Sequence, residues 1–292
     1  MLLDCRDLIF LRLAGMYRWL PYDVLSRFDF DDLIREIDIL VLSKLVHISL
    51  NKEYIHLTPK GYNLLQNSGY DYSPGAKRPY EGCSFLRRRL EVAEIMLTAL
   101  RAGIDVFQDN VDSLREQPVF LPAFSIRNGE NNVMNAANCA GFGHWGDKAY
   151  MLQYVGAESV GMYLLGELQY LNNLASVFDK TLKTPNALMF VGLSYSQTYG
   201  QICNATPSKR HGRKGFHDFW DVWQKCDIPI HLLSCDEIGA KQLALMSQPD
   251  YNAKIARAAF GDKIVYDYEI PETNGCVGGR PLVMAHFCSY NI

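Results

Sequence analysis

Apolar side chains near the start of the chain recur at the spacing of one helix face. Ile9, Leu13, Met16 and Leu20 occupy this face, and charged residues fall between them. Because proline lacks the backbone N–H that a helix interior requires, Pro21 predicts the end of this first helix.

Two further helices are expected, one over residues 22–28 and one after Asp29. Asp29 is a good N-cap residue, because its carboxylate can accept hydrogen bonds from the first backbone N–H groups of a helix. Leu33, Ile37 and Leu40 then recur on one face. The pattern therefore predicts three successive helices.

Beyond the third helix, the spacing changes from helical to alternating. Val46, Ile48 and Leu50 are apolar and alternate with polar residues, as expected of a half-buried strand. A turn is expected at residues 51–52, and residues 54–57 return as the second strand. This part of the sequence predicts a β-hairpin.

A closing helix is expected directly after the hairpin. Thr58 can cap it, and Pro59 fits the first helical position, where no N–H is needed. The helix is expected to stop at residues 67–69, which read Asn-Ser-Gly.

Three helices, a hairpin and a capped closing helix resemble a winged helix-turn-helix, and the segment LTPKGYNLLQNSGY carries the likeness. This module, followed by an α/β region, resembles the replication-relaxation proteins of plasmids and integrative conjugative elements. The resemblance implies a DNA-binding accessory protein of replication or transfer. It also implies a relaxase or a replication initiator as the protein partner.

The rest of the chain alternates between strand and helix patterns. Apolar runs of strand length lie at residues 119–126, 149–155, 187–193, 228–233 and 263–268. Helical patterns lie at residues 159–178, 214–225 and 236–246, the last opened by Ser234-x-x-Glu237, which reads as a capping box. This alternation predicts an α/β domain with a mixed or parallel sheet.

A stretch rich in proline and glycine separates the two parts. We therefore expect a winged helix-turn-helix domain over residues 1–73, a linker over 74–82 and a larger α/β domain over 83–292. The replication-relaxation family has been related to restriction-endonuclease-like folds. The resemblance thus implies a degenerate form of that fold for the second domain.

Composition narrows the class of protein. The chain of 292 residues is 48% hydrophobic and carries a formal charge of -3, so it is globular and any affinity for nucleic acid must come from local patches. No apolar run is long enough to span a membrane. The eight cysteines form no CxxC pair, which favours reduced thiols over a metal site. We expect a cytoplasmic protein without a metal or cofactor.

Several sequence motifs that are typical of enzymes are missing from the chain. It contains no GxxxxGK[ST], HExxH or GxSxG motif, and no glutamate is followed two positions later by lysine, as metal-dependent nucleases of the related fold require. The polar, glycine-rich stretch 127–147 is interpreted as a surface loop rather than an active site. We expect no catalytic activity, and a divergent metal-dependent nuclease stays open as an alternative.

The clearest basic tract lies in the second domain. Lys209, Arg210, Arg213 and Lys214 can neutralise phosphates without reading bases. Aromatic residues follow at helical spacing over 216–223, which favours core packing over stacking on bases.

The first domain contributes weaker candidates. The third helix is acidic, with carboxylates at positions 29, 31, 32, 36 and 38, and suits readout of DNA poorly. DNA contacts are therefore also expected from Arg35, Lys44, Lys52, Lys60, Arg87 and Arg88. The alternative is a protein-docking adaptor that uses the acidic helix to bind a basic partner.

A further helix carries leucine, alanine and isoleucine at alternating steps of four and three between residues 86 and 104. This spacing allows two interpretations. The favoured one is an amphipathic helix packed on the second domain, and the other is the seam of a homodimer.

Overall fold

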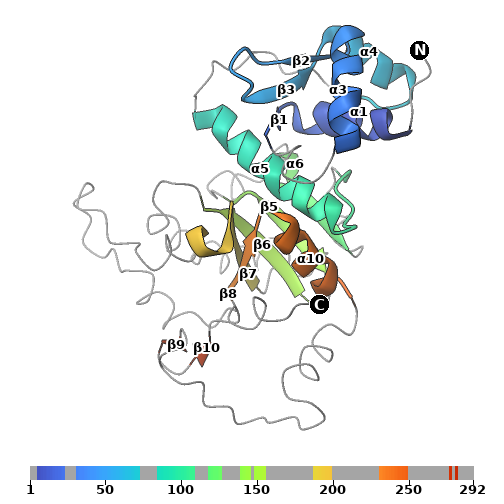
Figure 1. The fold of residues 1–292 in the computed structure, drawn as a ribbon. Coiled ribbons are helices and arrows are strands. Elements are labelled where there is room, and N and C mark those ends of the chain that lie inside the picture. Colours follow the sequence, from blue (N-terminus) through green and yellow to red (C-terminus); the bar gives the residue numbers. More distant parts are fainter. Residues whose placement is uncertain are drawn as a thin grey trace. The chain divides into compact units, whose positions relative to one another are not determined.

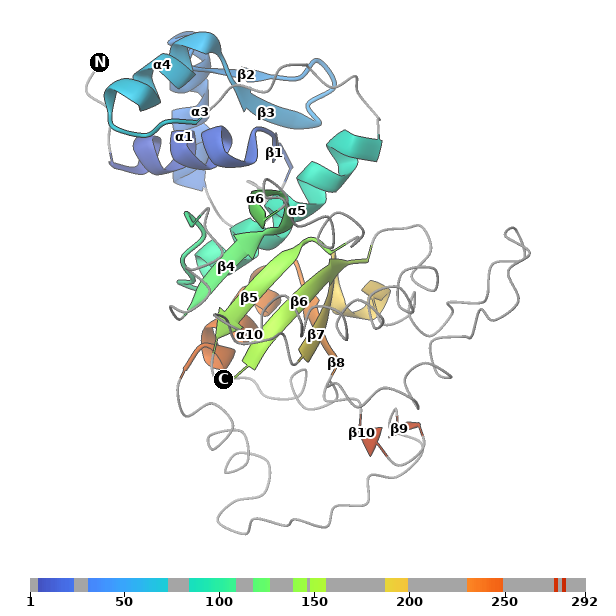
Figure 2. The same cartoon turned by 180° about the vertical axis from the view of Figure 1, so that it is seen from behind.

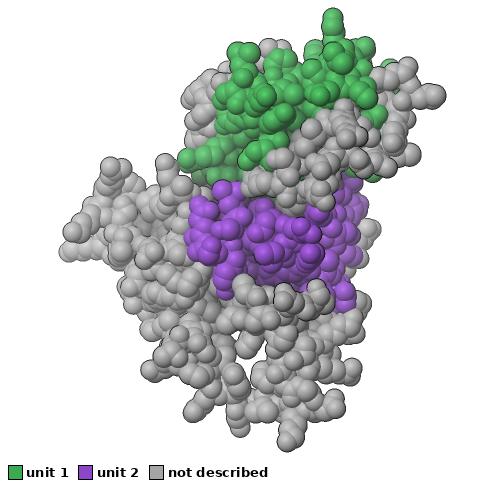
Figure 3. Space-filling view, viewed as in Figure 1, with its two compact units in different colours: residues 1–97 green, residues 98–292 purple. Residues whose placement is uncertain are grey.

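The computed structural model describes ten segments of the chain: residues 5–23, 31–72, 84–108, 118–126, 139–145, 148–155, 187–198, 230–248, 276–277 and 280–281. The chain divides into two compact units, Met1–Leu97 and Thr98–Ile292 (Figure 3). The expected linker, 74–82, lies outside the described residues.

Unit 1 combines helices with a small antiparallel sheet (Figure 1). The order of its elements is α1 (Cys5–Tyr17), β1 (Leu20–Pro21), α3 (Asp31–Leu42), β2 (Val46–Ile48), β3 (Tyr54–Leu57) and α4 (Pro59–Asn67). The strand order is β1-β3-β2, and α1 packs against α3, α4 and β3. The expected helix over 22–28 lies almost entirely outside the described residues.

Two expectations for the first helix are wrong. Helix α1 ends at Tyr17 because Arg18 adopts a left-handed φ of 69°, and Leu20 and Pro21 pair with β3 as strand β1 instead. Ile9, expected on the buried face, is 43% exposed, since Phe10 and its neighbours face the core.

The hairpin forms as predicted, but the alternation breaks at its turn. Ser49 is buried and Leu50 is 96% exposed, the reverse of the expected pattern. The reason is that the Ser49 hydroxyl accepts from the backbone N–H of Glu53 at 2.9 Å and of Tyr54 at 3.0 Å, which turns it inward.

The closing helix α4 is confirmed at both ends. The Thr58 side chain accepts from the Gly61 N–H at 3.2 Å, and Pro59 occupies the first helical position. At the other end, Gly69 has a φ of 87°, and the Tyr70 N–H donates to the Leu65 carbonyl at 2.9 Å. This is the Schellman ending that the glycine suggests.

Helix α5 (Ser84–Arg101) begins in unit 1 and contains the division between the units. Its first turn places Leu86 in a buried cluster with Trp19 and Tyr54, and Leu90 packs against that cluster. Positions 92–99 are buried within the single chain. This burial favours the packed helix over the dimer seam, although its first turn packs on unit 1 rather than on the second domain.

Unit 2 is built around a five-stranded mixed sheet (Figure 2). The strands lie in the order β4 (Val119–Pro122), β5 (Gly141–Trp145), β6 (Lys148–Tyr154), β7 (Ala187–Gly192) and β8 (Ile230–Ser234). Strands β4, β5 and β6 are antiparallel, whereas β6, β7 and β8 are parallel. A mixed sheet combined with helices confirms the coarse fold class.

Three details of unit 2 differ from expectation. Strand β4 stops at Pro122 and is followed by α6 (Ala123–Ile126). Residues 141–145, expected in a loop, form the buried strand β5. A short antiparallel pair, β9 (Cys276–Val277) and β10 (Arg280–Pro281), was not expected.

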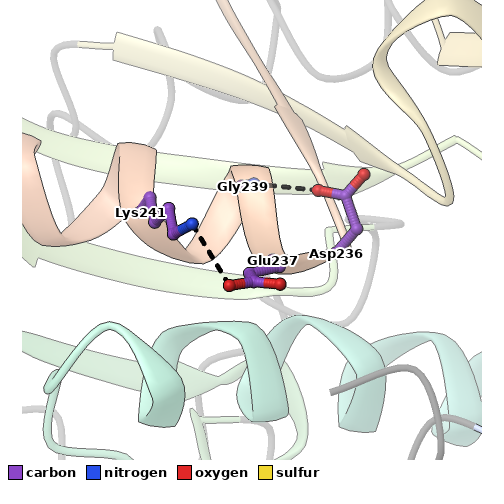
Figure 4. A network of polar contacts seen from close by, with 4 residues as sticks. All are labelled: Asp236, Glu237, Gly239 and Lys241. Atoms are coloured by element: carbon purple, nitrogen blue, oxygen red, sulfur yellow. Dashed lines mark hydrogen bonds and ion pairs between the residues drawn. The ribbon is translucent and has the colours of Figure 1, made fainter. Parts of the chain in front are cut away.

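The cap of helix α10 (Glu237–Met246) is the fourth difference. Asp236, not Ser234, is the N-cap residue, and its carboxylate accepts from the Gly239 N–H at 2.9 Å (Figure 4). Ser234 ends β8, and its hydroxyl donates to Asp236 at 2.6 Å. The expected elements at 159–178, 214–225 and 263–268 lie outside the described residues.

Among the described helices, none combines the length and the apolar character needed to cross a bilayer.

Candidate nucleic-acid interface

Two of the expected DNA-contacting lysines meet where α3 ends and α4 begins. Lys44 follows α3 with a left-handed φ of 59°, and the next N–H, of Leu45, donates back to the Leu40 carbonyl at 2.9 Å. The Thr58 hydroxyl, which caps α4, donates to the Lys44 carbonyl at 2.6 Å. Thr58 thus connects the end of α3 to the start of α4.

Lys60 lies on the first turn of α4 and reaches the same place. Its ammonium donates to the Ser43 carbonyl at 3.0 Å, at the C-terminal end of α3, where the helix dipole concentrates partial negative charge. Both lysines are exposed. The α3–α4 junction, which we define as Ser43, Lys44, Thr58 and Lys60, therefore presents two ammonium groups to solvent from neighbouring backbone positions.

Lys52 occupies the opposite end of the hairpin. It is exposed in the turn with a φ of 55°, and its ammonium lies 5.8 Å from the centroid of the Tyr22 ring. The neighbouring Glu53 carboxylate accepts from the Asn51 amide at 3.3 Å. The turn thus carries one positive and one negative group side by side.

The outward face of α3 has a different character. Asp38 is exposed, and two large apolar side chains stand beside it, Ile39 at 52% and Leu42 at 82% exposure. Arg35 lies in α3, with its side chain outside the described part. This face is apolar and acidic where a DNA-reading helix needs polar donors.

On α5, the basic side chains stand beside acidic ones. Arg87 and Arg88 are exposed, and the Arg87 Nε lies 3.9 Å from a Glu91 carboxylate oxygen, one helical turn further on. Burial raises the pKa of Glu91 to about 7, Arg87 and Arg88 lower it, and Glu94 raises it further. An arginine that already lies beside a carboxylate, as Arg87 does, offers less to a phosphate than an isolated cation does.

The basic tract of the second domain, Lys209, Arg210, Arg213 and Lys214, lies outside the described residues, as do residues 127–138 of the glycine-rich stretch. Within the described segments, no group of three or more His, Cys, Asp or Glu side chains could hold a metal ion.

The structure therefore brings Lys44 and Lys60 together and keeps Lys52 apart. Sequence reasoning selected Lys60 as a phosphate contact and missed its bond to the Ser43 carbonyl. It also missed that His47 and His56 pair across the hairpin, although counting outward from the turn at 51–52 gives that register.

Comparison of the chain with protein-family models, with curated proteins and with solved structures finds no match.

Proposed function

We propose that this chain is a DNA-binding accessory protein of plasmid or conjugative-element replication or transfer, with unit 1 as a winged helix-turn-helix. The element order supports the winged-helix assignment, since a short strand after the first helix pairs with the second strand of the hairpin. Such modules commonly bind DNA with the helix before the hairpin and with the hairpin itself.

The observation that carries the proposal is the pair of lysines at the α3–α4 junction. Lys44 and Lys60 are both exposed, the Thr58 hydroxyl holds the backbone of Lys44, and the Ser43 carbonyl holds the ammonium of Lys60. The ammonium groups of these two neighbouring lysines can each neutralise a phosphate and release counterions. Binding of this kind is driven by the DNA backbone rather than by base sequence.

The test is fluorescence anisotropy with labelled duplex and single-stranded DNA at about 50 and 200 mM salt. We expect the full chain to bind with a steep salt dependence. Replacing both lysines, as Lys44→Gln with Lys60→Gln, should weaken binding and reduce the slope of log K against log salt by about 1.8, for two lost phosphate contacts.

Lys241→Gln is the matched control. Lys241 is 71% exposed on α10, where it pairs with Glu237 at 3.1 Å, far from the junction in sequence (Figure 4). This variant should leave both affinity and slope unchanged. Absence of binding by the wild-type chain at the lower salt concentration would refute the proposal.

The second candidate function is a protein-docking adaptor, and the exposed apolar side chains of α3 favour it. Ile39 and Leu42 together form an outward apolar face beside Asp38, which suits a basic, amphipathic protein partner. Apolar docking differs from phosphate binding because it loses little affinity with salt. A relaxase or replication initiator that binds the wild-type chain but not Leu42→Ser, independently of salt, would establish this function instead.

A nuclease is the least supported of the three. The arrangement of a helix, three antiparallel strands and a parallel fourth strand agrees with the fold that the family resemblance implies. However, neither β5 nor β6 contains an aspartate or glutamate, and those two strands would supply the carboxylates that bind Mg²⁺. Cleavage of DNA in the presence of Mg²⁺ would overturn this ranking.

A further inference from the structure

Two histidines face each other across the hairpin of unit 1. In the antiparallel pairing of β2 with β3, His47 lies directly opposite His56. Directly opposite residues share one face of a sheet, with their Cβ atoms about 4.5–5.5 Å apart. The ring centroids are 5.0 Å apart with an angle of 48° between the ring planes. The two imidazoles are therefore neighbours by register.

This spacing matches a metal ion held between two imidazoles. A nitrogen–metal bond of about 2.0–2.1 Å, extended to the ring centre, puts each centroid roughly 3.2 Å from the ion. Bond angles between a right angle and the tetrahedral value then separate the two centroids by roughly 4.5–5.2 Å. The observed 5.0 Å falls inside this interval. The strands therefore hold the rings at the separation that a shared ion requires.

The hairpin around the pair is held in place from several sides. Strand β3 pairs on its other edge with β1, and the Thr58 N–H donates to the Leu45 carbonyl at 3.0 Å at the base of the hairpin. At the turn, the Ser49 N–H donates to the Tyr54 carbonyl at 2.9 Å. Little conformational freedom needs to be lost when an ion binds, which favours affinity.

The pair is also accessible. His47 is exposed and His56 is half-buried, so an ion can approach from the His47 side. The Tyr54 ring lies 5.7 Å from the His56 ring and is buried in the cluster with Trp19. Tyr54 lies two residues before His56 on the same face of β3, so it packs beside the His56 ring, and solvent can complete the coordination on the exposed His47 side.

We propose that His47 and His56 form a bidentate site for a late first-row divalent ion such as Ni²⁺ or Zn²⁺. Imidazole nitrogen suits these ions, whereas Mg²⁺ and Ca²⁺ prefer oxygen ligands. Water fills the remaining positions, so the ion stays open to a further ligand. The bound ion cross-links the two strands of the hairpin. This site lies beyond the proposed function and does not depend on DNA binding.

The experiment uses the full chain labelled at its histidine rings and follows each ring by NMR while Ni²⁺ is added. Paramagnetic Ni²⁺ broadens the signals of nearby rings, so the readout locates the ion even though the chain contains other histidines and cysteines. We expect the His47 and His56 signals to broaden together, before other histidine signals, and Mg²⁺ to leave them unchanged. Because protons compete for imidazole nitrogen, the broadening should need more Ni²⁺ at acidic pH.

Single substitutions separate a shared site from two independent rings. In His47→Gln, the loss of the second ligand should raise the Ni²⁺ concentration that broadens His56 by about tenfold or more, because the second bond forms within the molecule. His47 is exposed, so this variant should keep its fold, which circular dichroism checks. His217→Gln is the control and should leave the pair unaffected. Unchanged broadening of His56 in His47→Gln would overturn the proposal, as would broadening of only one of the two rings in the wild-type chain.

Discussion

Glu91 links the stability of unit 1 to pH through a single carboxyl group. Burial raises its pKa from 4.5 to about 7, and the neighbouring Arg87 only partly offsets this increase. The folded chain therefore holds a proton on Glu91 between these two pH values, while the unfolded chain has lost it. Because the folded state binds more protons there, the free energy of unfolding falls as the pH rises from about 4.5 to about 7.

Replacing Glu91 by the neutral Gln should remove this dependence. Relative to the wild-type chain, Glu91→Gln should be more stable near pH 8 than near pH 5, by roughly 1–3 kcal/mol between the two conditions. Urea unfolding at both pH values measures the difference. Glu237→Gln, on an exposed side chain of α10, is the control and should show no such change. An equal effect of Glu91→Gln at the two pH values would contradict the assignment.

Single positions are also where sequence reasoning failed most clearly. Leu50 continues a perfect alternation, yet it is exposed because the Ser49 hydroxyl binds the backbone of the turn. Ser234 and Glu237 have the spacing of a capping box, yet Asp236 is the cap. In both cases a short polar side chain had several backbone partners within reach, and tertiary context decided among them.

At the scale of elements, helices α3, α4 and α5 end in the same way. After α3, α4 and α5 the residue in the left-handed region is Lys44, Gly69 and Gly103, respectively. Only Lys44 carries a Cβ, which costs energy in that conformation. Lys44→Gly should therefore stabilise the protein by about 0.5–1 kcal/mol, as measured by urea unfolding.

Lys44→Ala separates the backbone effect from the loss of charge. Alanine removes the ammonium group but keeps the Cβ, so it should give no gain in stability. Equal stability of the glycine and alanine variants would show that the left-handed conformation at this position costs little.

The success of element prediction followed the strength of local signals. Helix α4 could be predicted at both ends because Thr58, Pro59 and Gly69 each act locally. Strand β5 was missed because its glycines suggest a loop. In the fold, the Trp145 ring fills the space where a Cβ of Gly143 would lie, so this glycine makes room for a ring two residues further along the same strand and does not form a turn.

At the scale of the whole molecule, the proposed DNA binding draws on residues far apart in sequence. Charge reversal of the basic tract, as Lys209→Glu, Arg210→Glu, Arg213→Glu and Lys214→Glu together, should lower DNA affinity and flatten its salt dependence, because four cations are lost. Anisotropy titrations of this variant and of the variant lacking the junction lysines measure how much each region contributes to DNA affinity. Wild-type affinity in the tract variant would leave the junction as the main contact.

How residues combine into a site was harder to predict than the residues themselves. Lys44, Lys52 and Lys60 were chosen by charge and by position in an expected motif. The grouping of Lys44 with Lys60 depends on the Thr58 and Ser43 contacts, which join residues 14 and 17 positions apart and leave no local pattern. The His47–His56 pair, by contrast, could be predicted from hairpin register alone.

The junction at Thr58 also bears on how such a protein can evolve. Because the hydroxyl and N–H of Thr58 hold the carbonyls of Lys44 and Leu45, the chain between them leaves and returns at one fixed point. Insertions at the turn then lengthen a hairpin whose two ends stay joined. Each doubling of a flexible loop adds only about 0.6 kcal/mol to the free energy of loop closure. Lineages can thus vary the reach of the hairpin while inheriting the helices unchanged.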